Sequence, residues 1–327
     1  MFKFGGPVRV AVAVAMMPVM LVQQSFAWGA QGHMMINRAA AAALPVDVPA
    51  FLRNGGALDT MEYLGPEPDR WKSRAEDELS SEQSPDHFID LEWADYADVP
   101  CTAGQGRCPA SGMDLPKRRY DYIRAVEKAA LLHPELKLTP EKIGLQPWQV
   151  QEVYQRLKAG LREYRKLQAG NRDTKPVEMA ILFYAGWLGH YVADGAQPLH
   201  TTIQYNGWTG SNANGYTADH KIHSLFESGY VSANVKAADL VPLIAASEPK
   251  VLQDEWADYL SYLRHSNSLV ERTYRIEKAG GFNGAGSPEA KAFTDERLAA
   301  GAIELRDLIY TAWVRSGDPV PEYKGAL

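Results

Sequence analysis

The feature that most constrains the fold of this chain is the helical spacing of its apolar residues. Apolar side chains return every three or four positions in several long segments, whereas the alternating pattern typical of β-strands is scarce. Neither an internal repeat nor a linker that would divide domains is visible. We therefore expect an all-α fold with a single, mostly helical domain. The expected helices cover residues 34–44, 120–132, 148–167, 177–192, 256–276 and 290–314.

Long connections between these helices are expected at 54–115 and 201–218. Both are rich in Pro, Gly, Asn and acidic residues, which favour turns and loops. Long loops in a helical protein usually carry function or are held by a bound ligand. We therefore expect the chemistry in and beside these connections, and we interpret 231–327 as helical scaffold without chemistry.

The first 27 residues have the three-part composition of a secretory signal peptide. A basic start precedes an apolar run at 10–22, and small residues lead to a cleavage position after Ala27. The run is shorter than the roughly 20 apolar residues of a membrane span. We expect residues 1–27 to be removed and the domain 28–327, beginning with Trp28, to be secreted or periplasmic. An uncleaved anchor is the alternative.

Charge limits the partners of the exported chain. The signal segment carries two basic and no acidic residues, so the net charge of -6 for the whole sequence becomes -8 for residues 28–327. This balance disfavours a broad basic surface for nucleic acid. Bound divalent cations would reverse the field locally, so a phosphate-bearing substrate at a metal centre stays possible.

Two cysteines flank a short loop. An exported chain meets an oxidising compartment, in which Cys101 and Cys108 can form a disulfide. With six residues between them, the bridge would contribute about 2 to 3 kcal/mol by the chain-entropy model. It would stabilise one loop rather than hold the fold. Metal binding by the two thiols is the alternative.

The strongest chemical motif is His190-Tyr-Val-Ala-Asp194-Gly-Ala-Gln-Pro-Leu-His200. His190 and Asp194 are four positions apart, so on a helix they share one face and can reach one ion. Pro198 cannot continue a regular helix, so the chain is expected to break before His200 and to turn that side chain toward a neighbouring position.

A second pair with the same spacing, His223 and Glu227, follows. An isolated pair of this kind is usually a solvated ion pair on a helix surface, but two pairs that flank a third histidine favour a metal site. Upstream, residues 86–90 place His87 between acids, and Asp69 offers another carboxylate. Imidazole and carboxylate ligands without thiolate suit zinc.

The remaining histidines have ordinary interpretations. His133 precedes a proline and His265 lies beside polar residues, so both are expected on the surface. His220 is expected in a loop, with a supporting contact to the metal ligands as the alternative.

Together these residues resemble the zinc-dependent superfamily that unites S1/P1-type nucleases with bacterial phospholipases C. Trp-x-x-x-x-His at the expected mature terminus, His-Phe-Ile-Asp, His-x-x-x-Asp-x-x-x-x-x-His and His-x-x-x-Glu occur in family order between Trp28 and about residue 230. The resemblance implies a helical domain of the phospholipase C/P1 nuclease type with long metal-bearing loops. It also implies three zinc ions, one bound by the amine and carbonyl of the cleaved amino terminus.

The resemblance also implies which residues hold each ion. Asp77, in the same connection as Asp69, is the alternative to that residue. One ion would be held by Asp69, His87, His190 and Asp194, its partner by Trp28, His33 and a shared Asp194, and the third by His200, His223 and Glu227.

Some of the remaining features resemble the nuclease branch of the superfamily, and others resemble the phospholipase branch. The five-residue step from Trp28 to His33 and the 23-residue interval from His200 to His223 resemble nucleases. Glu227 stands where nucleases normally have Asp, and His-Ser-Leu-Phe-Glu resembles the phospholipase form. We favour single-strand nuclease or 3′-nucleotidase activity, with phospholipase C as the alternative and a non-catalytic zinc-binding relative as the second alternative.

The implied reaction is hydrolysis of a phosphate ester by a hydroxide that bridges two ions about 3.5 to 4 Å apart. Asp69 is the candidate catalytic carboxylate, which would orient the attacking water or take its proton. No Gly-x-Ser-x-Gly elbow and no Gly-x-x-x-x-Gly-Lys loop is present, so covalent hydrolase and nucleotide triphosphatase chemistry are disfavoured.

Candidate substrate contacts follow His87 directly. Phe88 and Asp90 resemble the nuclease positions that stack on a base and hydrogen-bond its edge, although Phe88 could equally belong to the core. Stacking of this kind is worth about 1 to 3 kcal/mol per base. Lys72 is a possible phosphate contact, with a solvated lysine as the favoured interpretation. The expected partners are single-stranded nucleic acid or nucleotides, alternatively phospholipid, and no stable protein partner.

Overall fold

Helices make up nearly all the regular structure of this computed structural model, which describes residues 28–94, 99–100, 107–108 and 115–321. The strands within those ranges are β1 (Val99–Pro100) and β2 (Arg107–Cys108), which pair antiparallel. The expectation of an all-α, mostly helical domain is confirmed.

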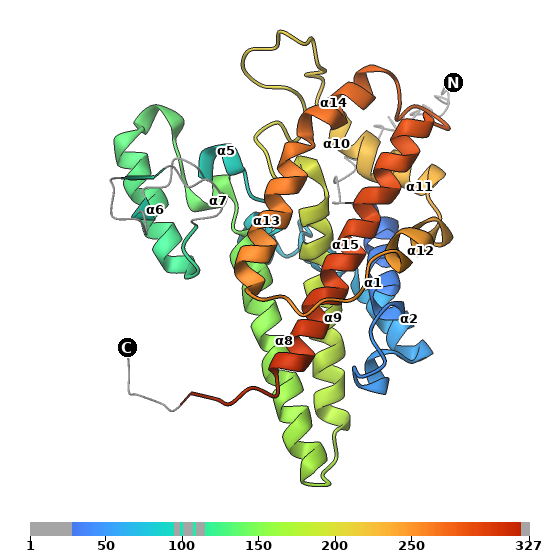
Figure 1. Cartoon of the computed structure of the whole chain (residues 1–327). Coiled ribbons are helices and arrows are strands. Elements are labelled where there is room, and N and C mark those ends of the chain that lie inside the picture. The colour runs from blue at the N-terminus through green and yellow to red at the C-terminus, as the bar shows by residue number, and fades with distance from the viewer. Residues whose placement is uncertain (1–27, 95–98, 101–106, 109–114, 322–327) are drawn as a thin grey trace, which may run out of the picture.

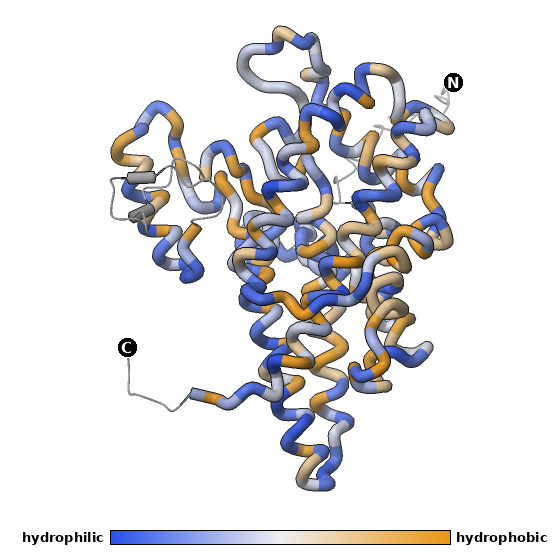
Figure 2. Tube along the Cα trace, in the orientation of Figure 1, coloured by the Kyte–Doolittle hydropathy of each residue, from blue (hydrophilic) through white to orange (hydrophobic). Residues whose placement is uncertain are grey.

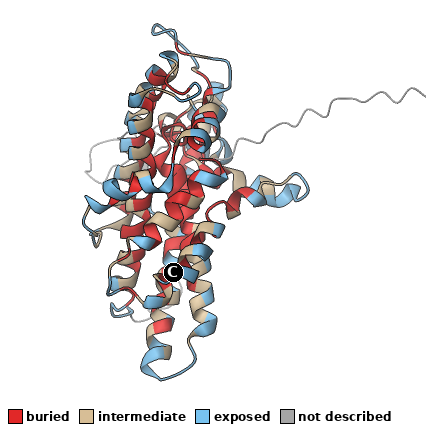
Figure 3. Cartoon of the chain, turned by 90° about the vertical axis from the view of Figure 1, so that its right-hand side faces the viewer, coloured by how far each residue is buried: buried red, intermediate tan, exposed pale blue. Residues whose placement is uncertain are grey.

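The centre of the fold is a long antiparallel hairpin of α8 (Gln146–Ala169) and α9 (Lys175–Ala196). Besides α8, α9 packs against α1 (Gly29–Ala42), α2 (Gly55–Leu64) and α15 (Pro288–Arg315) (Figure 1). The tip of the hairpin projects into solvent, whereas the buried residues gather in the middle of the bundle (Figure 3). The carboxyl-terminal half of α9 is therefore the most enclosed helical segment near the predicted metal ligands.

Shorter helices surround this bundle, and polar and apolar residues alternate along most of them (Figure 2). None of the helices in the described ranges is both long and apolar enough to cross a membrane. The shorter helices are η1 (Ala50–Leu52), α3 (Glu67–Trp71), α4 (Asp77–Gln83), η2 (Ser84–His87), α5 (Leu91–Ala94), α6 (Arg119–Leu132), η3 (Pro134–Leu136), α7 (Pro140–Ile143), η4 (Pro198–His200), α10 (Ile222–Ser224), the π-helical η5 (Leu225–Tyr230), α11 (Val231–Asn234), α12 (Ala237–Ala245), α13 (Glu255–Ser268) and α14 (Val270–Lys278).

Two expectations about the helices need correction. The helix expected at 256–276 is broken into α13 and α14 at Leu269, whose amide donates to the Ser266 carbonyl at 3.0 Å. The first part of the long connection expected at 54–115 is largely helical, because α2 to α5 are short helices whose Pro, Gly and acidic residues resemble loop composition. The connection at 201–218 is irregular, as expected. The helix break before His200 is also observed, since α9 ends at Ala196.

Candidate metal centre

The predicted ligand side chains converge from seven helical elements on one buried place in the bundle. None of them is more than 6% exposed. They form three groups, in each of which the candidate ligand atoms lie within 4.8 Å of one another. The side chains are His33 on α1, Asp69 on α3, His87 on η2, His190 and Asp194 on α9, His200 on η4, His223 on α10 and Glu227 on η5.

The first group joins α1 to α9. His33 Nε2 lies 3.4 Å from Asp194 Oδ1, and His190 Nε2 lies 3.4 Å from Asp194 Oδ2. The two imidazole rings stack with their centroids 4.0 Å apart. Each oxygen of Asp194 therefore faces a different histidine, which suits a carboxylate shared between two ions.

The second group shares His190 with the first. Asp69 Oδ1 lies 3.8 Å from His190 Nε2 and 3.9 Å from His87 Nε2. Its other oxygen lies 4.0 Å from His33 Nε2. Asp69 thus stands between the first and second groups, whereas Asp77, its alternative, is exposed on α4.

The third group also adjoins Asp194, whose Oδ1 lies 4.0 Å from His200 Nδ1. His223 Nε2 is 3.1 Å from His200 Nε2 and 2.9 Å from Glu227 Oε2, and His200 Nε2 is 3.7 Å from the same carboxylate oxygen. Glu227 belongs to a π-helical stretch, a rare conformation that often occurs at functional sites.

Backbone carbonyls set the orientation of four of the five histidines. A carbonyl oxygen only accepts hydrogen bonds, so each Nδ1 carries a proton, and in the neutral imidazole Nε2 is then the atom that can bind a metal ion. The Nδ1 atoms of His87, His190, His200 and His223 donate at 2.8 to 2.9 Å to the carbonyls of Gln83, Gly65, His87 and Tyr205.

The donor atoms in these groups therefore fit a cation. The lone pairs of His87 Nε2 and His190 Nε2 are buried without a hydrogen-bond donor, as are both oxygens of Asp194. Buried acceptors that face only one another are costly unless a positive charge lies between them. The set contains nitrogen and oxygen atoms in groups of three or more, which matches the ligand preference of zinc.

Burial and the neighbouring charges change the pKa values of the ligands. Burial lowers the pKa values of His33, His87 and His190 well below 6.5, so these imidazoles are neutral and able to bind metal at neutral pH. Burial, reinforced by the neighbouring carboxylate of Asp69, raises the pKa of Asp194 well above its usual value. A bound cation would offset that penalty by stabilising the ionised carboxylates.

Trp28 is placed between two segments that carry candidate ligands. Its side chain is fully buried, and its indole nitrogen donates to the Ala193 carbonyl at 2.7 Å, next to Asp194. Its ring makes a T-shaped contact with Phe226, next to Glu227, with centroids 5.3 Å apart. The residues before Trp28 lie outside the described ranges, so signal cleavage and the amine ligand stay predictions.

The interpretation of Lys72 as a solvated lysine was wrong. Its Nζ lies 2.7 Å from Asp69 Oδ1, and its side chain is only 20% exposed. Burial lowers the pKa of this amine, but the carboxylates of Asp69 and Asp194 outweigh that effect and raise it. Lys72 thus brings a fixed positive charge to the edge of the metal centre.

A pocket of about 460 Å³ opens onto His87 of the second group and onto His200 and His223 of the third. Phe88 and Asp90 both line it, and Phe88 is half-buried rather than part of the core. Asp90 is 5% exposed, and burial, with the nearby Glu92, raises the pKa of its carboxyl group to about 8. Two further residues that line this pocket, Trp93 and Lys142, were not singled out from the sequence. Lys142 Nζ lies over the Trp93 ring, 4.1 Å from its centroid.

The residues interpreted as ordinary lie away from the centre. His220 and His265 are exposed, and His133 lies 3.5 Å from Glu135 on the surface. Cys101 lies outside the described residues, so its pairing with Cys108 stays a prediction.

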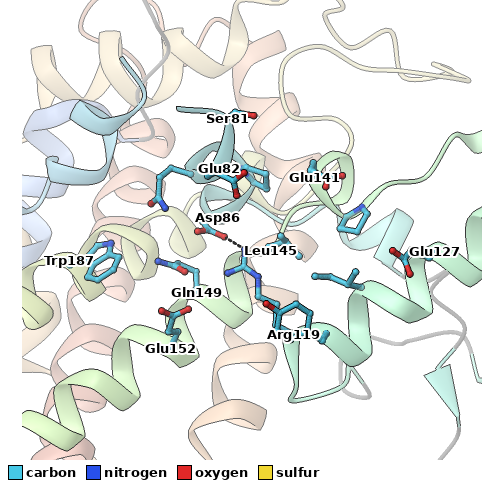
Figure 4. A pocket seen from close by; sticks show the side chains of 15 residues that line it. Ser81, Glu82, Asp86, Arg119, Glu127, Glu141, Leu145, Gln149, Glu152 and Trp187 are labelled. Atoms are coloured by element: carbon cyan, nitrogen blue, oxygen red, sulfur yellow. Dashed lines mark hydrogen bonds and ion pairs between the residues drawn. The ribbon is translucent and has the colours of Figure 1, made fainter. Parts of the chain in front are cut away.

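A second pocket, of about 770 Å³, lies beside η2 and is lined by an ion pair that the sequence did not suggest (Figure 4). Arg119 Nη2 on α6 donates to Asp86 Oδ1 at 2.9 Å. Burial raises the pKa of Asp86 to about 6, although the guanidinium opposes this. Since Asp86 precedes His87, the pair connects α6 to the helical turn that carries one of the candidate ligands.

Fold and site together define a class: an all-α domain whose core brings together three adjoining groups of imidazole and carboxylate ligands. Comparison with protein-family models and with curated proteins finds no significant match. Among solved structures, the chain is similar to an alpha-toxin of Clostridium perfringens isolated from avian strain SWCP, at 15% sequence identity and a TM-score of 0.36. That match covers 88% of this chain and 64%, less than two thirds, of the toxin chain.

Proposed function

We propose that this protein is an exported, zinc-dependent phosphoric-ester hydrolase of the phospholipase C/P1 nuclease superfamily that cleaves single-stranded nucleic acid or 3′-nucleotides. The observation that carries this proposal is the set of three adjoining ligand groups, linked through His190, Asp194 and Asp69. A structural zinc site is typically one closed group of four ligands, whereas several adjoining ligand groups suit the two-metal centres of phosphate-ester hydrolases.

Asp69 and Lys72 have distinct roles in the proposed hydrolysis. Bound zinc would lower the pKa of water and neutralise charge on phosphate oxygens. Asp69, whose two oxygens face histidines of both neighbouring groups, would orient the attacking water and take its proton. Lys72, at 2.7 Å from Asp69, would hold a phosphate oxygen close to that carboxylate.

The pocket favours a base-bearing substrate over a lipid head group. A carboxyl group with a pKa of about 8 is protonated at neutral pH, so Asp90 can donate one hydrogen bond and accept another, as the edge of a nucleobase requires. Phe88 lines the same pocket and offers a ring on which a base can stack.

Phospholipase C is the second candidate because of one residue. Glu227, with its Oε2 at 2.9 Å from His223, occupies the position at which the nuclease pattern normally has Asp. Its longer side chain still supplies an oxygen ligand. Glu227 is therefore compatible with metal binding, but it favours the phospholipase branch of the superfamily. A zinc-binding relative without catalytic activity is the third candidate.

The test uses protein secreted with its own signal segment. Zinc content is measured by mass spectrometry, and initial rates are measured on single-stranded DNA, RNA, a 3′-nucleotide and phosphatidylcholine vesicles. We expect about three zinc ions per chain and cleavage of the nucleic-acid substrates. Lipid hydrolysis alone would transfer the assignment to phospholipase C, and zinc binding without hydrolysis of bis(nitrophenyl) phosphate would leave only a binding protein.

A matched pair of variants tests the centre itself. His190→Ala removes a ligand common to two groups, whereas His133→Ala alters a surface histidine. We expect His190→Ala to lose zinc and activity and His133→Ala to retain both. Equal effects of the two substitutions would contradict the proposed centre.

A further inference from the structure

The loop between η4 and α10 supports His223, one of the two histidines of the third ligand group, from two consecutive residues. His223 Nδ1 donates to the carbonyl of Tyr205 at 2.9 Å, and the His223 backbone amide donates to Asn206 Oδ1 at 3.3 Å. The direction of the His223 imidazole therefore depends on where residues 205 and 206 lie.

A single tyrosine hydroxyl brackets those two residues. Tyr274 on α14 is fully buried, and its hydroxyl donates to the Gln204 carbonyl at 2.6 Å. The same oxygen accepts a hydrogen bond from the Gly207 amide at 2.9 Å. The peptide groups immediately before and after residues 205–206 are thus bound to one atom of the scaffold.

The surroundings make this hydroxyl a rigid anchor. The Tyr274 ring packs against Trp208 and Tyr216 of the same loop, with centroids 5.2 and 5.5 Å apart. Burial raises the pKa of the Tyr274 hydroxyl to about 12, so it keeps the proton that it donates. Tyr205 is 56% exposed, and its ring makes a T-shaped contact with the His223 imidazole, with centroids 6.2 Å apart, so the Tyr274 hydroxyl is the buried group that ties this part of the loop to the scaffold.

We propose that Tyr274 is a positioning residue for the third metal ligand group and acts through the Tyr205 carbonyl on the tautomer and direction of His223. The segment 231–327 therefore contributes to the metal centre, although it supplies no ligand. This inference rests on the proposed function only in requiring that His223 binds zinc. Contacts that orient a ligating histidine typically change metal affinity by about ten- to hundredfold.

The test compares two tyrosines of the same aromatic cluster. Tyr274→Phe removes the bracketing hydroxyl and keeps the ring. Tyr216→Phe removes a hydroxyl that donates to Glu271 Oε1 at 3.0 Å, a contact that does not involve residues 204 to 207. Zinc content is followed at increasing chelator concentration. We expect Tyr274→Phe to release one ion at about ten- to hundredfold lower chelator concentration than wild type, and Tyr216→Phe to match wild type.

A double-mutant cycle separates positioning from a general loss of stability. In a His223→Ala background, Tyr274→Phe should have no further effect on the remaining ions, because the residue through which it acts is absent. Unchanged zinc release by Tyr274→Phe, or equal loss of every ion in both backgrounds, would overturn the inference. Wild-type protein that binds no zinc would instead refute the proposed function.

A second variant covers the case in which Tyr274→Phe does not fold. That failure would show that the hydroxyl serves the fold as a whole and would overturn a specific role. Asn206→Ala then tests the loop alone, because it removes the contact to the His223 amide at 3.3 Å without touching the buried cluster. Release of the same single ion is expected if the loop positions His223, and unchanged zinc release would contradict this.

Discussion

Replacing Asp194 by asparagine should change stability in opposite directions with and without zinc. In the zinc-free protein the Asp194 carboxylate is buried with both oxygens unpaired, so the neutral amide should stabilise the fold by about 1 to 3 kcal/mol. In the zinc-loaded protein the same change removes a charged ligand that lies 3.4 Å from each of two histidines. Removing one partner of a buried charge pair costs about 3 to 5 kcal/mol.

The raised pKa of Asp194 also makes the stability of the zinc-free protein depend on pH. Burial raises the pKa of Asp194 well above the usual 3.8, so the folded state holds this proton at pH values where the unfolded chain has lost it. Wild-type stability should therefore fall as pH rises above about 4, and the advantage of Asp194→Asn should grow over the same range. Urea unfolding curves with excess zinc and with a chelator measure both effects.

A buried carboxylate with a cationic partner provides the control. Asp307 is 4% exposed and accepts a hydrogen bond from Arg306 Nε at 2.8 Å. Asp307→Asn should destabilise the fold by about 3 kcal/mol whether or not zinc is present. The reasoning would be refuted if Asp194→Asn had the same sign in both conditions, because Asp194 would then have a partner other than a metal ion.

Four other outcomes are expected. An additional methionine before Trp28 should lower zinc content and activity together, since it moves the amine that the resemblance assigns as a ligand; full zinc content in that form would exclude the amine. Phe88→Ala should raise KM for nucleotides by about 5- to 150-fold, the equivalent of about 1 to 3 kcal/mol of stacking, without changing hydrolysis of bis(nitrophenyl) phosphate. Because the pKa of Asp90 is about 8, activity on base-bearing substrates should fall above that pH in wild type and stay level in Asp90→Asn, as a pH-rate profile would show. Burial raises the pKa of Glu304 to about 8, so wild type should lose up to about 1.4 kcal/mol per pH unit between pH 5 and 8 relative to Glu304→Gln; parallel urea curves for the two proteins would contradict this.

The helices were predictable wherever apolar periodicity extends over several turns. The expected segment 177–192 lies within α9, and 290–314 lies within α15. The short helices of 55–94 were missed because a helix of one or two turns has too few apolar positions to show a period, and because its prolines and glycines also favour loops. The break at Leu269 has no Pro or Gly to mark it in the sequence.

The candidate ligands were predictable from motifs, but the hydrogen bonds that orient them were not. The pairs His190 with Asp194 and His223 with Glu227 follow from a spacing of four residues. The carbonyls that orient the histidines belong to the backbone, and any residue type can supply one. The two hydrogen bonds of the Tyr274 hydroxyl have no sequence signal either, because they join it to peptide groups about 70 positions earlier in the chain.

Close packing around α9 explains how so many unpaired acceptors stay together before a metal ion binds. A Cβ on Gly189 would lie 2.0 Å from Asn37 Oδ1 on α1, and one on Gly195 would lie 2.7 Å from the Tyr259 hydroxyl on α13. Each glycine is the direct neighbour of a candidate ligand, so α9 cannot move away from its neighbours at those points without losing packing. The Asn37 amide also donates to carbonyls of α2 and α9 at 3.0 and 2.9 Å. The scaffold therefore holds the ligands of α1 and α9 in place against their mutual repulsion, and a bound cation would relieve an electrostatic cost that the helix packing already sustains.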